Sequence, residues 1–295
     1  MMNSPRFTAT QLRFVLGILL SLCAGCGGKT GNTLITTCDL PSDQAGTLSG
    51  RWQTTPIPIA LHQGDFSSSE AAQIAAAVAT WNEFFGASAN LQILNPGSGT
   101  IQTSNAGLPN ASVLCSSSDI SGTQYSQPIV IYKDTTWPAA YSQEAIALTS
   151  YCWTSGSSGS VKASATTAAS AQVAATVSTR VASTSGSTAS AIQAQLRPFS
   201  LAITEVNYQY FFTSGGYDPD LQTILLHELG HVLGLNHSCN DTTTPGFPTC
   251  TGSGANSDYQ EAVMYPVFGF YSNGQGEQRR SLNDNDESRA NCLYL

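Results

Sequence analysis

The alternation of apolar and polar residues predicts the first elements of the fold. Between residues 57 and 61 every second position is Ile or Leu, which is typical of a half-buried strand. The stretch "SSSEAAQIAAAVATWNEFFG" then changes to a helical period. Ser67 and Glu70 have the spacing of a capping box at its start, and Gly86 is expected to end it. The apolar face of this predicted helix is formed by Ile74, Val78, Trp81 and Phe85.

A second helix is predicted from "YDPDLQTILLHELGHVLG". Asp218 suits the N-cap, Pro219 the first helical position, and Asp220 the positive end of the helix dipole. Gly234 is a natural C-terminal stop. The closing stretch "SLNDNDESRANCLYL" begins with Asn and Asp capping signals and predicts a short terminal helix. Shorter apolar runs predict strands at 91–94, 128–132, 145–153 and 199–212.

Two segments differ from the rest in composition. Residues 27–50 are rich in Gly, Thr and Ser and are expected to be a flexible tether before a domain at 51–295. Within that domain, residues 154–197 consist almost entirely of Ser, Ala, Thr, Gly and Val. Such residues bury little apolar surface, so a mobile low-complexity insertion is expected. The alternative is a lid or an adhesive surface loop.

Charge excludes one class of partner. Only 10% of the residues are charged, the net charge is −8, and the 11 Lys and Arg residues are spread along the chain. Binding to a nucleic acid requires clustered positive charge. We therefore expect no nucleic-acid partner.

The N-terminus has the layout of a bacterial secretory signal. Arg6 and Arg13 precede an apolar run at 14–22 that is too short to span a bilayer. "Cys-Ala-Gly-Cys" at 23–26 is similar to a lipobox, so residues 1–26 are expected to be a signal peptide and Cys26 an acylated mature N-terminus. The alternative is an ordinary signal peptide that is cut nearby. The protein is expected to be exported and lipid-anchored at the cell envelope, or otherwise secreted.

Cysteine usage agrees with export. With Cys23 in the signal peptide and Cys26 reserved for lipid, six of the eight cysteines remain. An even number in an oxidising compartment predicts three disulfides, of which Cys239 with Cys250 is the most local candidate. The other pairings are not decided by the sequence.

The stretch "LLHELGHVLGL" combines an apolar helical face with metal-ligand chemistry. His227 and His231 are four residues apart, so both imidazoles project from one face of a helix and can reach one ion. Glu228 is the residue after His227 and projects from an adjacent part of the helix surface, where it can contact a ligand of that ion. A structural helix that carries histidines by chance is the alternative.

A third histidine completes the pattern. His237 follows His231 by six residues, which requires the chain to turn after the helix, and Gly234 stands where this turn is needed. The result is H-E-x-x-H-x-x-G-x-x-H, and it contains three of the four histidines in the chain. Three protein ligands with an open fourth position are typical of catalytic zinc, with Glu228 as the general base.

This motif resembles that of the metzincin metalloproteases. Met264, 27 residues after His237, matches their Met-turn, and Met-Tyr-Pro with Pro266 is similar to the matrixin branch. The resemblance covers about 51–295. It implies an α+β fold with a twisted, mostly parallel sheet, an active-site helix and a C-terminal helix. It also implies that Met264 lies beneath one catalytic Zn²⁺. Residues 265–268, including Tyr265 and Pro266, would form one wall of the pocket for the residue after the scissile bond; core packing is the alternative for Tyr265 and Phe268.

Two features of animal matrixins are missing. Only His62 is left for their second, His-bound zinc, so that site cannot form, and the sequence does not support a Ca²⁺ site. Their latency motif is also absent, although Cys38 lies at a comparable distance before Trp52. Cys38 is either an inhibitory zinc ligand or a disulfide partner, and the even number of cysteines favours the disulfide. Cys239, soon after the third histidine, is also similar to the pappalysins, but Met-Tyr-Pro argues against that family.

The sequence thus predicts a monomeric zinc endopeptidase that cleaves protein or peptide substrates outside the cytoplasm. The alternative is a non-catalytic surface lipoprotein that uses the same fold for adhesion or partner binding. The presence of Glu228 favours the enzyme.

Overall fold

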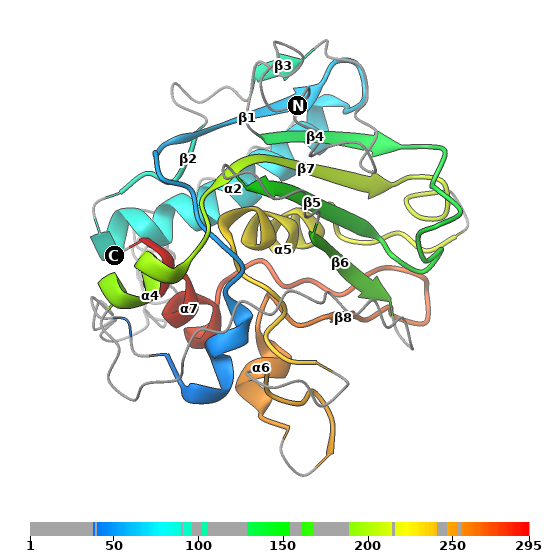
Figure 1. Cartoon of the computed structure of the whole chain (residues 1–295). Helices are drawn as coiled ribbons and strands as arrows, with labels where there is room; N and C mark the ends of the chain where they lie inside the picture. The colour runs from blue at the N-terminus through cyan, green and yellow to red at the C-terminus, as the bar shows by residue number, and fades with distance from the viewer. Residues whose placement is uncertain are drawn as a thin grey trace, which may run out of the picture. The chain divides into compact units, whose positions relative to one another are not determined.

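The architecture is taken from a computed structural model, drawn in Figure 1. All residues that it describes belong to one unit that spans residues 35–295. These described residues are 38, 40–89, 91–95, 102–104, 129–153, 161–167, 189–213, 216–240, 247–252 and 255–294.

A mostly parallel central sheet carries the fold. Its strands are β1 (Ile57–His62), β2 (Leu94–Asn95), β3 (Gln102–Ser104), β4 (Ile129–Asp134), β5 (Ala147–Trp153), β6 (Val161–Thr167), β7 (Phe199–Asn207) and β8 (Val267–Phe268). Their order is β2-β1-β4-β7-β5-β6-β8, with β3 also pairing with β1. The pairs β1–β4 and β4–β7 are parallel, whereas β5 runs antiparallel to both β7 and β6. The expected α+β class with a mostly parallel sheet is confirmed.

The helical elements are η1 (Ser42–Thr47), α2 (Ser68–Ala89), α4 (Ala189–Gln195), α5 (Leu221–Leu233), α6 (Ser257–Glu261) and α7 (Asp284–Tyr294). Figure 1 shows α2 and α5 beside each other. The indole of Trp81 in α2 donates to the Leu226 carbonyl of α5 over 3.0 Å. Both helices share one apolar cluster with Ile57 and Ile59 of β1. The main core therefore lies between this helical layer and one face of the sheet.

Two helix ends differ from the prediction. Helix α2 continues past Gly86 to Ala89, because Gly86 does not adopt the positive φ that ends a helix. The N-cap of α5 is Asp220 rather than Asp218, and its side chain accepts from the Thr223 amide. The Asp218 backbone instead pairs with residues 274–276, which holds it outside the helix.

Strand ends also shifted relative to the prediction. The run at 91–94 contributes only Leu94 to β2, since the Leu91 amide donates to the Phe85 carbonyl of α2. The run at 199–212 ends as a strand at Asn207, where the chain turns. The strands expected at 128–132 and 145–153 are confirmed as β4 and β5, as is the C-terminal helix.

The N-terminal boundary lies earlier than expected. Residues 40–50 belong to the predicted tether, yet Leu48 pairs with Leu235 and the Ser49 amide donates to the Gly234 carbonyl over 2.8 Å. Leu48 is buried by these contacts, so this part of the segment is packed on the domain. The expected signal peptide, its Cys26 and residues 27–37 lie outside the described residues.

The low-complexity segment at 154–197 contains two elements, β6 and α4. The insertion, which was expected to be mobile, thus has regular structure at residues 161–167 and 189–195. Their regular structure comes from tertiary pairing, since β6 bonds to β5 and α4 packs against α7. The other residues of the insertion up to 188 lie outside the described part of the chain.

Disulfides link distant parts of the chain. Cys38 is bonded to Cys292 and Cys239 to Cys250, and Cys152 is also disulfide-bonded. The local Cys239–Cys250 prediction is confirmed, and the alternative that Cys38 is a free inhibitory thiolate is wrong. Such bonds indicate an oxidising compartment outside the cytoplasm. Among the described helices, none is long and apolar enough to cross a bilayer.

Candidate metal centre

Helix α5 positions two of the three predicted ligands. Asp220 caps its first turn, accepting from Thr223 over 3.0 Å, and forms an ion pair with Arg280. The apolar residues of the helix are buried, so α5 cannot rotate without exposing them. His227 and His231 are thereby fixed on one face, one helical turn apart.

Gly234 turns the chain back toward that face. Its φ is 112°, and its amide donates to the carbonyls of Gly230 and His231. A Cβ at Gly234 would lie 2.0 Å from the Gly50 carbonyl oxygen, so the position requires glycine both for conformation and for space. The role predicted for Gly234 is confirmed, and the turn leads directly to His237.

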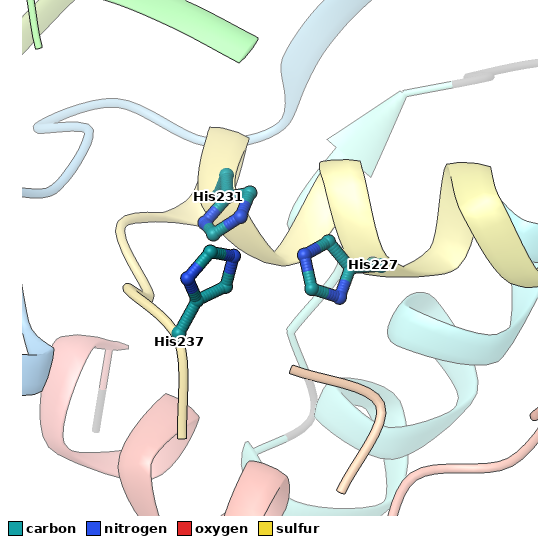
Figure 2. A group of neighbouring side chains, drawn as sticks. All are labelled: His227, His231 and His237. Atoms are coloured by element: carbon teal, nitrogen blue, oxygen red, sulfur yellow. The ribbon is translucent and has the colours of Figure 1, made fainter. Parts of the chain in front are cut away.

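The three imidazoles converge. Their ring centroids are separated by 4.7 Å for His227 and His231, 5.3 Å for His227 and His237, and 5.0 Å for His231 and His237. One ligand nitrogen from each lies within 4.8 Å of the others. Figure 2 shows the rings facing a common point between the helix and the segment after it. The three residues could hold one metal ion.

Hydrogen bonds set the tautomers of the two helical ligands. His227 Nδ1 lies 2.7 Å from the Val263 carbonyl oxygen, and His231 Nδ1 lies 2.7 Å from that of Leu235. Because a carbonyl only accepts, each Nδ1 carries the proton and each Nε2 presents a lone pair. Both Nε2 atoms are buried and have no hydrogen-bond partner among the described residues. This is the arrangement that metal-ligating histidines adopt.

Burial also keeps these imidazoles neutral. Desolvation, followed by the proximity of His237, lowers the pKa of His227 to about 3. Desolvation and the two neighbouring histidines lower the pKa of His231 well below its ordinary value. Neutral imidazole is the form that binds a metal, so near neutral pH the helical ligands need not lose a proton.

Met264 lies directly beneath α5. A Cβ at Gly230 would meet the Met264 sulfur at 2.2 Å, which shows how closely the thioether approaches the helix backbone. Met264 is fully buried. The residue before it, Val263, supplies the carbonyl that holds His227. The turn at residues 263–264 therefore fixes the histidine site, because Val263 bonds to His227 and Met264 packs against α5 at Gly230.

Asp286 in α7 holds this turn and was not predicted. Its carboxylate accepts from the Val263 amide over 2.7 Å and from the Met264 amide over 3.2 Å. It is fully buried beside Arg289, whose guanidinium donates to the Asn236 carbonyl next to His237. The i,i+3 spacing of Asp286 and Arg289 was visible in the sequence, but their partners lie far away in the chain.

Glu228 is buried on the same helix. Its Oε2 accepts from the Thr149 hydroxyl of β5 over 2.7 Å. Thr149 Oγ1 lies 2.9 Å from Thr204 Oγ1 of β7. Since the Thr149 proton is donated to the carboxylate, Thr204 donates to Thr149. The two threonines were not singled out in the sequence; a hydroxyl within an otherwise buried strand was the available signal.

A small pocket opens beside His227. Tyr265, Pro266 and Phe268 line it together with residues of α5. Arg279 also lines it, with its guanidinium 5.2 Å from the centre of the Tyr265 ring. The predicted wall residues thus lie next to a candidate metal ligand.

The remaining histidine lies elsewhere. His62 Nδ1 is 2.9 Å from Asp65, at the end of β1. Within the described part of the chain, His227, His231 and His237 form the one cluster of His, Cys, Asp and Glu residues with metal-binding geometry. No family model matches the chain, and no curated protein or solved structure matches it significantly.

Proposed function

We propose that this protein is a zinc-dependent endopeptidase of the metzincin class, similar to the matrixins, that hydrolyses peptide bonds of extracellular proteins. One observation carries the proposal. Three imidazoles converge beside a buried glutamate that belongs to the same helix as two of them.

The donor set favours zinc among the common metals. Three neutral imidazoles suit a borderline ion, whereas Mg²⁺ and Ca²⁺ prefer oxygen ligands. When bound, zinc at a three-histidine site with an open position lowers the pKa of a water ligand and polarises a carbonyl group. His227, His231 and His237 would hold the ion, and the carbonyls of Val263 and Leu235 keep the two helical rings in the required tautomer.

Glu228 supplies the proton transfers. Its carboxylate accepts a proton from the attacking water and returns it to the leaving amine. Thr149 binds Oε2 and so restricts the rotamer of this side chain. Burial excludes bulk water from the carboxylate, which strengthens its interactions with the reacting groups.

The proposal assigns substrate positioning to the residues that line the pocket beside His227. Tyr265, Pro266 and Phe268 would receive the side chain that follows the scissile bond.

Export and anchoring are part of the proposal. The disulfides agree with a location outside the cytoplasm. The lipobox-like sequence before Cys26 supports a diacylglyceryl anchor. Intact mass of the native protein tests it: a mature chain that starts at Cys26 without a lipid adduct contradicts the anchor.

The test of function compares two matched variants. Zinc content of the purified chain is measured by elemental analysis, and hydrolysis is assayed against a peptide library. Glu228→Gln should lower kcat by about 10²–10⁴-fold while zinc stoichiometry stays unchanged. Glu83→Gln, on the exposed side of α2, is the control and should leave both unchanged. If the unmodified protein binds zinc but hydrolyses no peptide, the enzyme proposal is contradicted and the non-catalytic surface lipoprotein is favoured.

A further inference from the structure

Strand β6 is bonded on both sides by strands that are distant in the chain. Residues 161–165 pair antiparallel with 147–151 of β5, and residues 166–167 pair parallel with 267–268 of β8. Figure 1 shows β6 alongside β5, with β8 beyond it. One segment from the low-complexity insertion therefore joins β5 to the strand that follows the Met264 turn.

The register takes β6 past the candidate site. Ala163 is opposite Thr149, the residue whose hydroxyl donates to Glu228. Neighbouring strands lie about 5 Å apart, so the β6 backbone passes one strand spacing from the residue that holds the proposed base. β6 also contacts α5, and its last two residues pair with β8 directly after Pro266 of the pocket wall.

The gap that β6 fills is complementary to the backbone of an extended peptide. Without β6, the outer edge of β5 and the facing edge of β8 would both present unpaired N–H and C=O groups. Such edges bind polypeptides by strand addition, with affinity supplied by main-chain hydrogen bonds. The sequence of β6, "VKASATT", is dominated by small residues, and its backbone pairs with both neighbouring strands.

We propose that residues 161–167 are an intramolecular competitor of the substrate: they occupy the groove between β5 and β8, and a peptide substrate must displace them. The identity of the displacing ligand as a substrate rests on the proposed endopeptidase function. The pairing of β6 itself does not depend on that function.

Tethering makes this ligand an effective competitor. A segment on the same chain acts at an effective concentration on the order of millimolar. Competition of this kind raises KM for a peptide substrate and leaves kcat unchanged, because a saturating substrate displaces β6 completely. The unmodified protein is therefore a slow enzyme at low substrate concentration.

Proline substitution in the full-length chain tests the pairing. Ala163→Pro with Ala165→Pro removes two amide donors from β6 and leaves β5 intact. The control, Ala169→Pro with Ala171→Pro, has the same spacing beyond the last residue of β6. Within residues 147–151, the alternate amides that face β6 should exchange about tenfold faster or more in the first variant and at an unchanged rate in the control. Unchanged exchange in α5 shows that the fold is intact, and Ala165→Pro alone serves if the double variant misfolds.

A peptide added in trans tests the groove. A blocked peptide with the sequence of residues 160–168, at millimolar concentration, should restore the slow exchange of residues 147–151 in the proline variant. The same peptide with proline at the two alanine positions of β6 should not. In a peptidase assay, the proline variant should have a KM lowered by about tenfold with kcat unchanged, and the blocked peptide should raise KM again.

Three results overturn the inference: unchanged exchange of β5 in both proline variants, no effect of the added peptide on that exchange, or an unchanged KM in an active protein. If no form of the protein hydrolyses any peptide, the proposed function fails. The exchange measurements with and without peptide still decide whether the groove binds a peptide strand.

Discussion

The Thr149 hydroxyl of β5 donates to Oε2 of Glu228 over 2.7 Å, and Thr204 of β7 donates in turn to Thr149. Two strands of the sheet thereby hold the carboxylate on the helix that packs against them. Both threonines are fully buried, so water does not replace these bonds readily.

Thr149→Val removes the donor and keeps nearly the same volume. A hydrogen bond to a charged group contributes about 1.5–3 kcal/mol, so kcat should fall by about 10–100-fold. KM and zinc stoichiometry should stay unchanged, because the substitution leaves the backbone of β5 in place and Thr149 is not one of the three proposed metal ligands. Thr149→Ser restores the hydroxyl and should recover most of kcat. A valine variant with the original kcat would show that Thr149 does not position Glu228.

Asp286→Asn tests the support beneath the site. An amide oxygen can accept only part of what the carboxylate accepts from Val263 and Met264. Outer contacts of this kind typically change metal affinity by about 10–100-fold, so zinc should bind that much more weakly in competition with a chelator. Asp284→Asn, at an exposed position two residues earlier in α7, is the control and should bind zinc normally. Equal zinc affinity in the two variants contradicts a supporting role for Asp286.

Alanine substitutions at two glycines with positive φ distinguish the cost of a left-handed backbone from the cost of a steric clash. Gly234 and Gly252 have φ values of 112° and 80°, but only at Gly234 would a Cβ meet backbone, at 2.0 Å from the Gly50 oxygen. Gly252→Ala should lower the free energy of unfolding by about 1–2 kcal/mol through the left-handed conformation alone. Gly234→Ala should cost clearly more and weaken zinc binding, because the turn to His237 must shift. Denaturant unfolding of the zinc-free proteins measures the free energy of unfolding of both variants. Equal decreases in the two variants would contradict the predicted clash at Gly234.

The lowered pKa of Glu70 predicts that the stability of the protein depends on pH. Burial acts to raise its pKa, but hydrogen bonds from Lys133, Tyr208 and Ser67 outweigh it and lower the pKa from 4.5 to about 2. The native state therefore favours the carboxylate, and the resulting stability is present above pH 4.5 and lost as the pH falls toward 2.

Glu70→Gln should accordingly lower the free energy of unfolding by about 1–2 kcal/mol at neutral pH, after allowance for solvent screening. The difference from the unmodified protein should shrink as the pH falls through this window. Glu83→Gln, at an exposed position of α2, should show no such trend. A difference for Glu70→Gln that is independent of pH would argue against the shifted carboxylate.

Much of the candidate site could be predicted because its parts are close in sequence. The spacing of His227 and His231 decides their common face, and Gly234 decides the turn to His237, since helical period and left-handed backbone are local properties. Boundaries were less predictable. The N-cap of α5 is Asp220 and not Asp218 as predicted, because the Asp218 backbone pairs with residues 274–276. The local sequence does not indicate this contact.

By itself, the sequence determined which residues can bind a metal, the mixed α/β character of the chain and the even number of cysteines that follow the expected signal peptide and Cys26. The tertiary structure decided which groups support that site: Thr149 for Glu228, Asp286 for the Met264 turn, and Cys292 rather than a metal for Cys38. It also decided that β6 lies between β5 and β8. The physical reason is the same throughout. Dihedral preferences and helical period act between neighbours, whereas a hydrogen bond, a disulfide or a strand pairing depends on groups that only the folded chain brings together.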